Sequence, residues 1–395
     1  MRLFVWLLFI SMISPGLRAQ TSKGPETVES EIKDAFNDIK EQRKTRAKGR
    51  AKKREKLKYA TSVAETVSPT DRDKLKRQIP ALEKKVAASP EDPKLREQLG
   101  RAYLVNGDYE RAVTNLKEAS QEANTETLFL LAEAYRGRKD YASEIRTLEV
   151  ITQTNENDSR ALELLGYAYF NSEDLNKSSQ YFRKALAVDP KRRKSYDGLL
   201  KIFEVRKNRY ESRVVYADMV KAFGEDSQAY SGLCRLYTED NLSESSIESC
   251  RKAISIDPNI PDNHVYLGMS YKYLKDMPQA QKILNKAAKT FPDSELALWA
   301  SAQLADEMKN WESARFYYRK CVKADPRSAR CYKRLAMITF NLKEYQDSLD
   351  AFARACELDR TTYTEIRNVT SQLRIANVEE WKEKFQEASD KCGMK

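Results

Sequence analysis

Hydrophobic and small residues return along this chain with a period of 34 residues. Within each period they recur at steps of three and four, which is the spacing of one face of an α-helix. Each period holds two such stretches, separated by a short polar turn. The pattern therefore predicts antiparallel helix pairs from about residue 93 to residue 362, with almost no strand.

Eight copies of the pattern share a column of mostly small residues in the first helix. Two helices approach closely only where both carry small side chains, so this column marks the predicted crossing of each pair. Two copies depart from the pattern: the second carries Glu144 at the small position of its second helix, and the fourth, roughly 193–226, carries Leu200, which indicates a wider crossing or a bend. The column reads Gly100, Ala132, Gly166, Leu200, Cys234, Gly268, Ala302 and Ala336.

The motif around the crossing is Leu-Gly-x-x-Tyr, at residues 99–103, 165–169 and 267–271. An alanine or serine, a bulky apolar residue and an alanine follow in the second helix, and Asp-Pro closes three units. This motif resembles the tetratricopeptide repeat. The resemblance implies an all-α fold, an α-α superhelix of about eight helix pairs with a C-terminal capping helix. It also implies a non-enzymatic protein that binds other proteins.

The predicted repeats, residues 93–362, are flanked by segments of different character. Residues 71–92 fit a half-repeat cap, although Pro80 argues against one long helix there. Residues 363–395 fit a capping helix and tail. Residues 20–70 form a basic, partly helical or flexible segment, and residues 1–19 have the parts of a secretory signal: Arg2, an apolar core at 3–13 and cleavage after Ala19. The alternative is an uncleaved membrane anchor.

Charge is concentrated in one segment. Residues 40–58 hold eleven Lys or Arg against two Glu, whereas the whole chain of 395 residues has a net charge of +11. The segment is either a solvated linker or a site attracted to an anionic membrane surface. Export argues against nucleic acid as a partner, and a mean hydropathy of −0.72 excludes a polytopic membrane protein.

The six cysteines all lie in the C-terminal part of the chain, and an even number of cysteines fits an oxidising compartment. Cys234 and Cys250 occupy the facing crossing positions of one unit, where they are either a disulfide or two small core residues. The other candidate pairs are Cys321 with Cys331, which flank one turn, and Cys356 with Cys392.

We find no motif for catalysis, for a metal or for a cofactor. The one histidine, His264, falls at a core position of a first helix, and no paired Cys/His spacing or phosphate-binding glycine motif is present. The sequence thus predicts no enzyme activity, no metal and no cofactor.

The tetratricopeptide resemblance places a partner-binding groove on the first helices. The residues implied to face it are aromatic, basic or apolar, which suits an acidic or apolar peptide. Glu97 and Arg101 replace the Lys-and-Asn clamp that some family members use for a C-terminal carboxylate. The fourteen groove residues are Arg101, Phe129, Arg160, Tyr167, Phe170, Lys201, Arg235, Val265, Met269, Lys272, Trp299, Lys333, Met337 and Phe340.

The sequence therefore favours an exported scaffold of the bacterial cell envelope, with the periplasm as its compartment. Two alternatives stay open. The first is a eukaryotic lumenal co-chaperone of the same repeat class. The second is an envelope-glycan-processing or glycan-binding protein.

Overall fold

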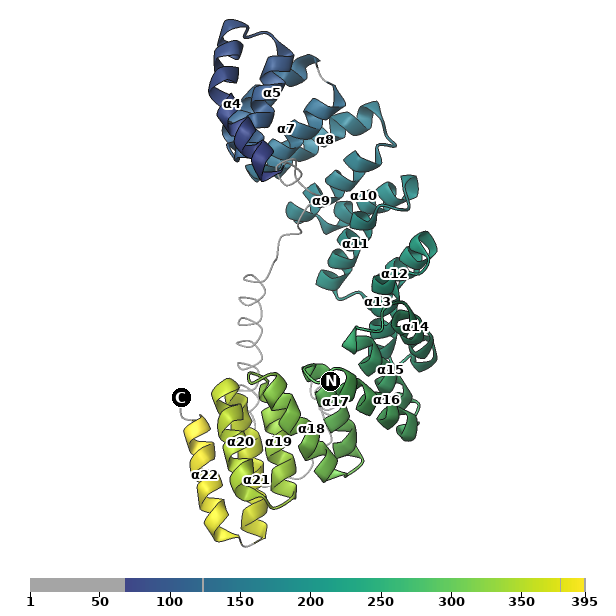
Figure 1. Cartoon of the computed structure of the whole chain (residues 1–395), viewed down its shortest axis with the longest axis vertical. Coiled ribbons are helices and arrows are strands. Elements are labelled where there is room, and N and C mark those ends of the chain that lie inside the picture. Colours follow the sequence, from purple (N-terminus) through teal and green to yellow (C-terminus); the bar gives the residue numbers. More distant parts are fainter. Residues whose placement is uncertain (1–67, 123, 377, 394–395) are drawn as a thin grey trace, which may run out of the picture. The chain divides into compact units, whose positions relative to one another are not determined.

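The computed structural model describes residues 68–122, 124–376 and 378–393. These residues form α-helices and two short 3-10 helices (η2, Ser120–Glu122, and η3, Arg360–Thr362), and none of them lies in a strand. Eight antiparallel pairs follow one another, as Figure 1 shows. The prediction of an all-α repeat fold is confirmed. The pairs are α5 (Pro93–Asn106) with α6 (Tyr109–Ala119), α7 (Thr125–Gly137) with α8 (Tyr141–Thr154), α9 (Ser159–Asn171) with α10 (Leu175–Val188), α11 (Arg193–Arg206) with α12 (Arg209–Phe223), α13 (Ser227–Glu239) with α14 (Ser243–Ile256), α15 (Pro261–Tyr273) with α16 (Met277–Thr290), α17 (Glu295–Glu307) with α18 (Trp311–Ala324), and α19 (Ala329–Asn341) with α20 (Tyr345–Leu358).

The turn inside each pair is built in the same way. One residue adopts a positive φ and thereby reverses the chain after the first helix. In most pairs an Asp or Asn follows it, and its side chain accepts a backbone hydrogen bond at the start of the second helix, as Asp276 does from Gln279. Gly107 fills the positive-φ position in the first pair. In the others it is filled, at intervals of one repeat, by Lys139, Glu173, Lys207, Asn241, Lys275, Lys309 and Lys343.

The glycines of the crossing column allow the close helix approach that the sequence predicts. A Cβ added at Gly268 would lie 2.6 Å from side-chain carbons of Leu284 on the partner helix, and Gly100 faces Leu116 in the same way. The missing side chain is what allows α15 and α16 to approach. The Asp-Pro steps also act as predicted, since Asp189, Asp257 and Asp325 are the C-caps of α10, α14 and α18.

The fourth pair solves the crossing differently. Leu200 is half-buried in the position where other units carry glycine or alanine. The Tyr216 ring of α12 packs instead over Gly232 of α13, so closely that a Cβ on Gly232 could not be accommodated without a shift. The bulky residue of this unit therefore packs closely on the first helix of the next unit, as Phe182 also does on Gly198.

Both ends of the array are covered by helices. α4 (Pro69–Ala88) is one continuous helix with Pro80 inside it, so the expectation of a break at that residue is wrong. The Pro80 side chain is exposed, while Ile79, Leu82 and Val86 pack onto α5 and its neighbours. Proline is tolerated because only the solvent side of this helix is disturbed.

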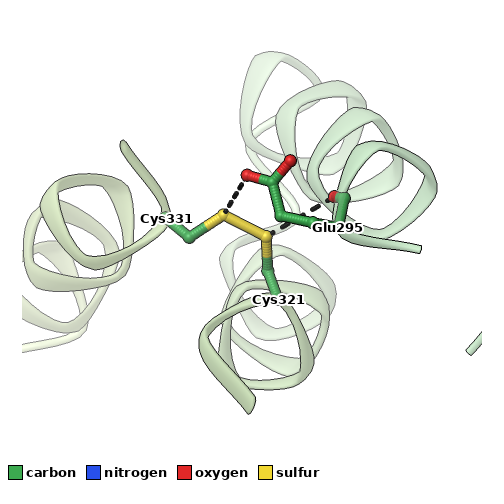
Figure 2. Close-up of side chains that lie close together, drawn as sticks. All are labelled: Glu295, Cys321 and Cys331. Atoms are coloured by element: carbon green, nitrogen blue, oxygen red, sulfur yellow. Dashed lines mark hydrogen bonds between the residues drawn. A yellow bond between two sulfur atoms is a disulfide. The ribbon is translucent and has the colours of Figure 1, made fainter. Parts of the chain in front are cut away.

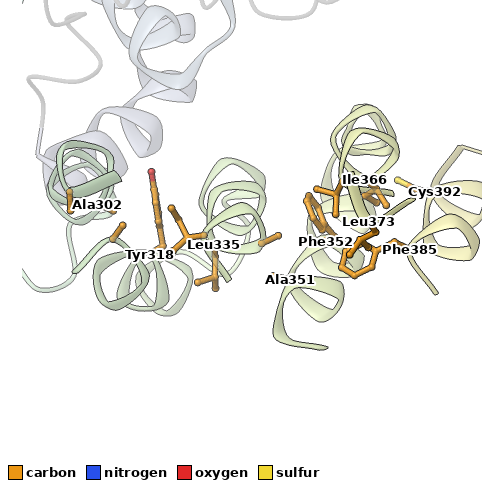
Figure 3. Close-up of a cluster of buried hydrophobic side chains, with 14 residues drawn as sticks. Ala302, Tyr318, Leu335, Ala351, Phe352, Ile366, Leu373, Phe385 and Cys392 are labelled. Carbon is orange, nitrogen blue, oxygen red and sulfur yellow. The ribbon is translucent and has the colours of Figure 1, made fainter. Parts of the chain in front are cut away.

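The C-terminal segment forms two helices, α21 (Tyr363–Ile375) and α22 (Glu379–Gly393), where one was expected. Leu373 accepts a 3.1 Å backbone hydrogen bond from Val378 across the turn between them. Figure 3 shows the apolar cluster that α22 closes, with Phe385 fully buried against Phe352 and Leu373. None of the helices described is long and apolar enough to span a bilayer.

Candidate functional site

A cavity of about 690 Å³ lies along the first helices of the N-terminal repeats, and we call it the N-terminal cavity. It brings together residues from α5, α7, α8, α9 and the start of α11. Seven cationic and five acidic side chains line it, together with Phe129 and Leu164. Three of the predicted groove residues, Arg101, Phe129 and Arg160, meet here.

The cations of the N-terminal cavity differ in how they are engaged. The Arg160 guanidinium lies 4.0 Å from the centroid of the Phe129 ring and pairs with Glu126 at 2.9 Å. Arg101, Lys191 and Lys194 are exposed and form no ion pair with any residue that the structure describes. Their charges are therefore available to an anionic ligand, whereas that of Arg160 is already partly neutralised.

The wall of this cavity is held by an ion pair whose carboxylate is buried and whose guanidinium is half-buried. Arg192 donates hydrogen bonds of 3.2 and 3.0 Å to the Glu163 carboxylate, and Ser195 donates another of 2.9 Å. Arg193 beside it donates to Asp226, the N-cap of α13. These contacts fix the backbone of 191–194, and so the place from which Lys191 and Lys194 extend.

A second cavity, of about 620 Å³, lies between α11, α12 and α13 and contains the groove residues Lys201 and Arg235. Both are paired with carboxylates on their own helices, Lys201 with Glu204 at 2.9 Å and Arg235 with Glu239 at 3.3 Å. Burial raises the pKa of the Tyr216 hydroxyl, and the positive charge of Arg235 opposes this rise. Leu200, the large residue at the crossing position of the fourth pair, also lines this cavity.

The groove cations of the later repeats are neutralised across repeat boundaries. Lys272 of α15 pairs with Glu307 of α17, and Lys333 of α19 pairs with Asp359 at 2.9 Å. The remaining groove residues of these repeats, Met269, Trp299, Met337 and Phe340, are half-buried. At the predicted groove positions the later repeats therefore carry paired lysines and half-buried apolar side chains.

Two of the fourteen residues do not face a groove in this structure. Tyr167 is 2% exposed and Val265 is fully buried, so both belong to the core between helices. Phe170 is half-buried. The reason is that neighbouring first helices pack against these positions, which column spacing alone did not reveal.

Sequence reasoning also missed residues that shape the site. Lys191, Arg192, Arg193 and Lys194 line the N-terminal cavity, although they lie before and at the start of α11 and outside the groove columns. Their signal in the sequence is four consecutive basic residues directly after Asp189-Pro190.

Three disulfides join the cysteine pairs that the repeat positions suggested: Cys234–Cys250, Cys321–Cys331 and Cys356–Cys392. Figure 2 shows Glu295 beside the second of them, with its Oε1 3.4 Å from Cys331 Sγ. Two thiolates and a carboxylate are a metal-binding set, and these three side chains do lie within 4.8 Å of one another. The sulfurs are bonded to each other, however, and Glu295 accepts hydrogen bonds of 2.7 Å each from Ser328 and Arg330, so this arrangement is structural.

The single histidine takes part in local packing. His264 Nε2 lies 2.9 Å from the Pro258 carbonyl oxygen, and its ring is 5.3 Å from that of Phe291. Residues 1–19 and the basic segment 40–58 lie outside the residues that the structure describes.

Comparison with known proteins agrees with this architecture. Models described as tetratricopeptide repeat match residues 97–159, 159–192, 227–260, 262–294 and 300–361, together more than half of the chain. These matches leave out 193–226, the pair with Leu200. Among solved structures, the chain is similar to Pseudomonas aeruginosa pilF (16% identity, TM-score 0.43, 53% of this chain and 96% of that one). It is also similar to YrrB, described as a TPR protein with an unusual peptide-binding site (14% identity, TM-score 0.39, 50% of this chain and 97% of that one).

Curated relatives include two plant proteins. The chain is 27% identical over 229 residues to DnaJ protein P58IPK homolog B of Oryza sativa subsp. japonica. The aligned residues cover 53% of this chain and 48% of the relative. It is 27% identical over 174 residues to DnaJ protein P58IPK homolog of Arabidopsis thaliana. The aligned residues cover 40% of this chain and 36% of that relative. The chain thus spans about half or less of the length of these relatives. The matched repeats and the fold show that this chain belongs to the tetratricopeptide-repeat family.

Proposed function

We propose that this protein is a non-enzymatic scaffold that binds acidic peptide segments of partner proteins in the N-terminal cavity. The observation that carries the proposal is the convergence of Arg101, Phe129 and Arg160 from three successive first helices on one cavity. The charges of Arg101, Lys191 and Lys194, which form no ion pair with any described residue, suit carboxylates.

Binding of a labelled probe peptide tests this proposal. The probe is a fluorescein-labelled peptide of glutamate, leucine and phenylalanine, and a peptide with lysine in place of glutamate is its control. We expect the glutamate probe to bind, and the double variant Arg101→Ala/Lys194→Ala to bind it more weakly with a flatter salt dependence, mainly through slower association. Lys117→Ala, an exposed cation of α6 outside the cavity, is the matched control. Equal affinity of the double variant and the wild type would exclude the cavity as the site.

We further propose that the protein works in an oxidising compartment after export, with the bacterial periplasm as the first candidate. Three disulfides among the described residues support an oxidising compartment. The apolar segment at 3–13 supports export. Mass spectrometry of unreduced protein from its native fraction tests the idea, because six free thiols there would contradict it.

The curated relatives favour a second candidate, a lumenal co-chaperone of a eukaryotic cell, since they are named DnaJ proteins. The only histidine in the sequence is followed by Val265, so it is not part of the His-Pro-Asp motif of a J-domain. The repeats are the part of this chain that would bind an unfolded client. Binding of an unfolded client by the purified chain is the expected behaviour, and its absence would contradict this candidate.

We also propose that residues 40–58 attach the protein to anionic membranes independently of the cavity. Their local charge supports this, because each basic residue near an anionic surface contributes about 1 kcal/mol. Deletion of 40–58 should abolish sedimentation with vesicles that contain phosphatidylserine and leave probe binding unchanged. Loss of probe binding with this deletion would place the function in the N-terminal segment.

A further inference from the structure

The second helices α16 and α18 carry a large excess of positive charge. α16 contains three lysines and no acidic residue, and α18 contains four cationic residues and a single glutamate. Their buried residues, such as Leu284 and Tyr318, pack inside the array. The charged side chains therefore lie on the solvent side of the two helices.

The repeat places most of these charges in one exposed column, which we call the lysine face. The sixth, tenth and thirteenth residues of α16 are lysines, and the same positions of α18 hold one phenylalanine and two lysines. All six side chains are exposed, and Phe316 keeps 53% of its surface accessible. The Lys320 ammonium lies 4.5 Å from the centroid of the Phe316 ring. The lysine face consists of Lys282, Lys286, Lys289, Phe316, Lys320 and Lys323.

The lysines of this face are not neutralised by neighbouring carboxylates. None of them forms an ion pair with a residue that the structure describes. The arginines of α18, in contrast, are engaged: Arg315 pairs with Glu344 and Glu312, and Arg319 pairs with Asp347 at 2.6 Å. Because Glu312 is the glutamate of α18, no acidic side chain of either helix is left to offset the lysines.

Acidic side chains border the lysine face. Asp276 caps the start of α16, and Asp293 and Asp325 lie in the turns that follow α16 and α18. The corresponding columns of α14 and α20 begin with the exposed Glu248 and Asp350. The repeat therefore confines the basic column to two adjacent units.

The residue types indicate which anionic surface fits. Contacts between folded proteins are enriched in arginine and depleted in lysine, whereas the cations left free here are lysines. A lysine carries a compact charge on a flexible stem, which suits mobile phosphate headgroups. An exposed aromatic ring among lysines is typical of a helix face that lies in the interface of a bilayer.

We propose that the lysine face is a docking surface for an anionic lipid bilayer, with the lysines against the headgroups and Phe316 inserted between lipids. The inference goes beyond the peptide-binding proposal, because it concerns second helices and not the N-terminal cavity. It rests on the proposed membrane attachment of residues 40–58 and specifies which surface of the repeats joins it.

The strength of the contact explains why it needs that attachment. Each lysine near an anionic surface strengthens binding about fivefold, so the lysine face alone would have an affinity in about the millimolar range. Such a contact does not hold a protein on vesicles during sedimentation. It adds to binding once another segment of the same chain holds the protein at the bilayer.

Binding of the full chain to vesicles tests the lysine face. The vesicles contain phosphatidylcholine and phosphatidylserine, and vesicles of phosphatidylcholine alone are the uncharged reference. The test variant is Lys286→Gln/Lys320→Gln. The matched control is Lys184→Gln/Lys252→Gln, which removes the same charge from the tenth position of α10 and α14, where these lysines are also exposed.

We expect Lys286→Gln/Lys320→Gln to weaken binding to the anionic vesicles about thirtyfold, and the control to weaken it about threefold or less. Both variants should keep the unfolding temperature of the wild type, because the changed side chains are exposed. Both should also keep its affinity for the glutamate probe, which binds elsewhere.

A fluorescent reporter distinguishes a bilayer from an acidic protein surface. Phe316→Trp places an indole in the lysine face, and Tyr210→Trp places one at an exposed position of α12. With vesicles whose acyl chains are brominated, the emission added by Phe316→Trp should be quenched. The emission added by Tyr210→Trp should not, since this indole would stay outside the bilayer.

The possible failures are distinct. Equal losses for the two double variants would show that net charge alone acts, and would overturn the lysine face. So would an unquenched indole at 316 together with binding of polyglutamate that Lys286→Gln/Lys320→Gln removes, because the ligand would then be an acidic protein. Both results leave the attachment through residues 40–58 standing. Vesicle binding that survives deletion of 40–58 but not the change of both lysines would contradict that attachment and support the lysine face. A full chain that does not bind anionic vesicles would overturn both.

Discussion

Glu163 of α9 and Arg192, the N-cap residue of α11, are joined by two hydrogen bonds, of 3.0 and 3.2 Å, across the boundary between two helix pairs. Glu163 is only 3% exposed. The pair therefore holds two repeats together at the wall of the N-terminal cavity, in a place where an unpaired carboxylate would be costly.

Removal of the Arg192 guanidinium should strongly destabilise the folded protein. We expect Arg192→Ala to lower the free energy of unfolding by about 2–3 kcal/mol, because the Glu163 carboxylate stays buried without its charged partner. Urea unfolding followed by circular dichroism measures the effect. Lys221→Ala, which breaks the exposed pair of Lys221 with Asp218 on one helix, is the control and should cost less than about 0.5 kcal/mol. Similar losses for the two variants would show that burial of Glu163 has no energetic consequence.

The turn lysines predict a gain in stability. Lys309 has a φ of 57°, a conformation that side chains with a Cβ disfavour and glycine adopts readily. We expect Lys309→Gly to raise the free energy of unfolding by about 0.5–1 kcal/mol, since the relief of strain exceeds the greater freedom of glycine in the unfolded chain. Lys309→Ala keeps the Cβ and should bring no gain. A gain from alanine as large as that from glycine would assign the effect to charge instead.

The Glu295 carboxylate predicts a loss of stability in acid. The hydrogen bond from Arg330 holds the pKa of this carboxyl below its usual 4.5, and Ser328 adds to the effect. The folded protein thus binds fewer protons at this site than the unfolded chain. The contribution of Glu295 to the free energy of unfolding is complete above the pKa that this carboxyl has in the unfolded chain. It is lost as the pH falls through the lower pKa of the folded protein.

Urea unfolding of wild type and Glu295→Gln at about pH 6, 4.5 and 3 measures this contribution. The wild type should be the more stable at the highest pH, and the difference should shrink at the lowest. A stability difference between the two proteins that stays constant over this range would mean that the pKa of Glu295 is the same in the folded and the unfolded state.

The sequence was sufficient for the elements that repeat and insufficient for those that do not. Gly268 and Leu284 recur in columns, so their contact could be predicted from spacing. The burial of Tyr167 and Val265 could not, because it depends on how neighbouring first helices pack. The cationic residues at 191–194 could not be predicted for a related reason: they lie at the boundary between a turn and the start of α11, outside the columns of the periodic pattern. Pro80 was misread because the cost of a proline depends on which side of the helix it faces.

The three disulfides differ in exposure, which predicts the order in which they are reduced. Cys234, Cys250, Cys321 and Cys331 are fully buried, whereas Cys356 is half-buried. Exchange requires attack by a thiolate on an accessible sulfur. Under native conditions a dithiol reductant should therefore open Cys356–Cys392 first. Alkylation at successive times, followed by peptide mass mapping, gives the order.

Opening this bond should loosen the last helix, because Cys392 is the covalent tie between α22 and α20. We expect Cys392→Ser to lower the free energy of unfolding by about 3 kcal/mol, in line with the loop closed by the bond, and to raise amide hydrogen exchange in α22 above that in α19. In denaturant, where burial no longer protects any sulfur, the differences in reduction rate should disappear. Earlier reduction of Cys321–Cys331 in the native protein would contradict the prediction, since it would mean that α18 and α19 separate before α22 does.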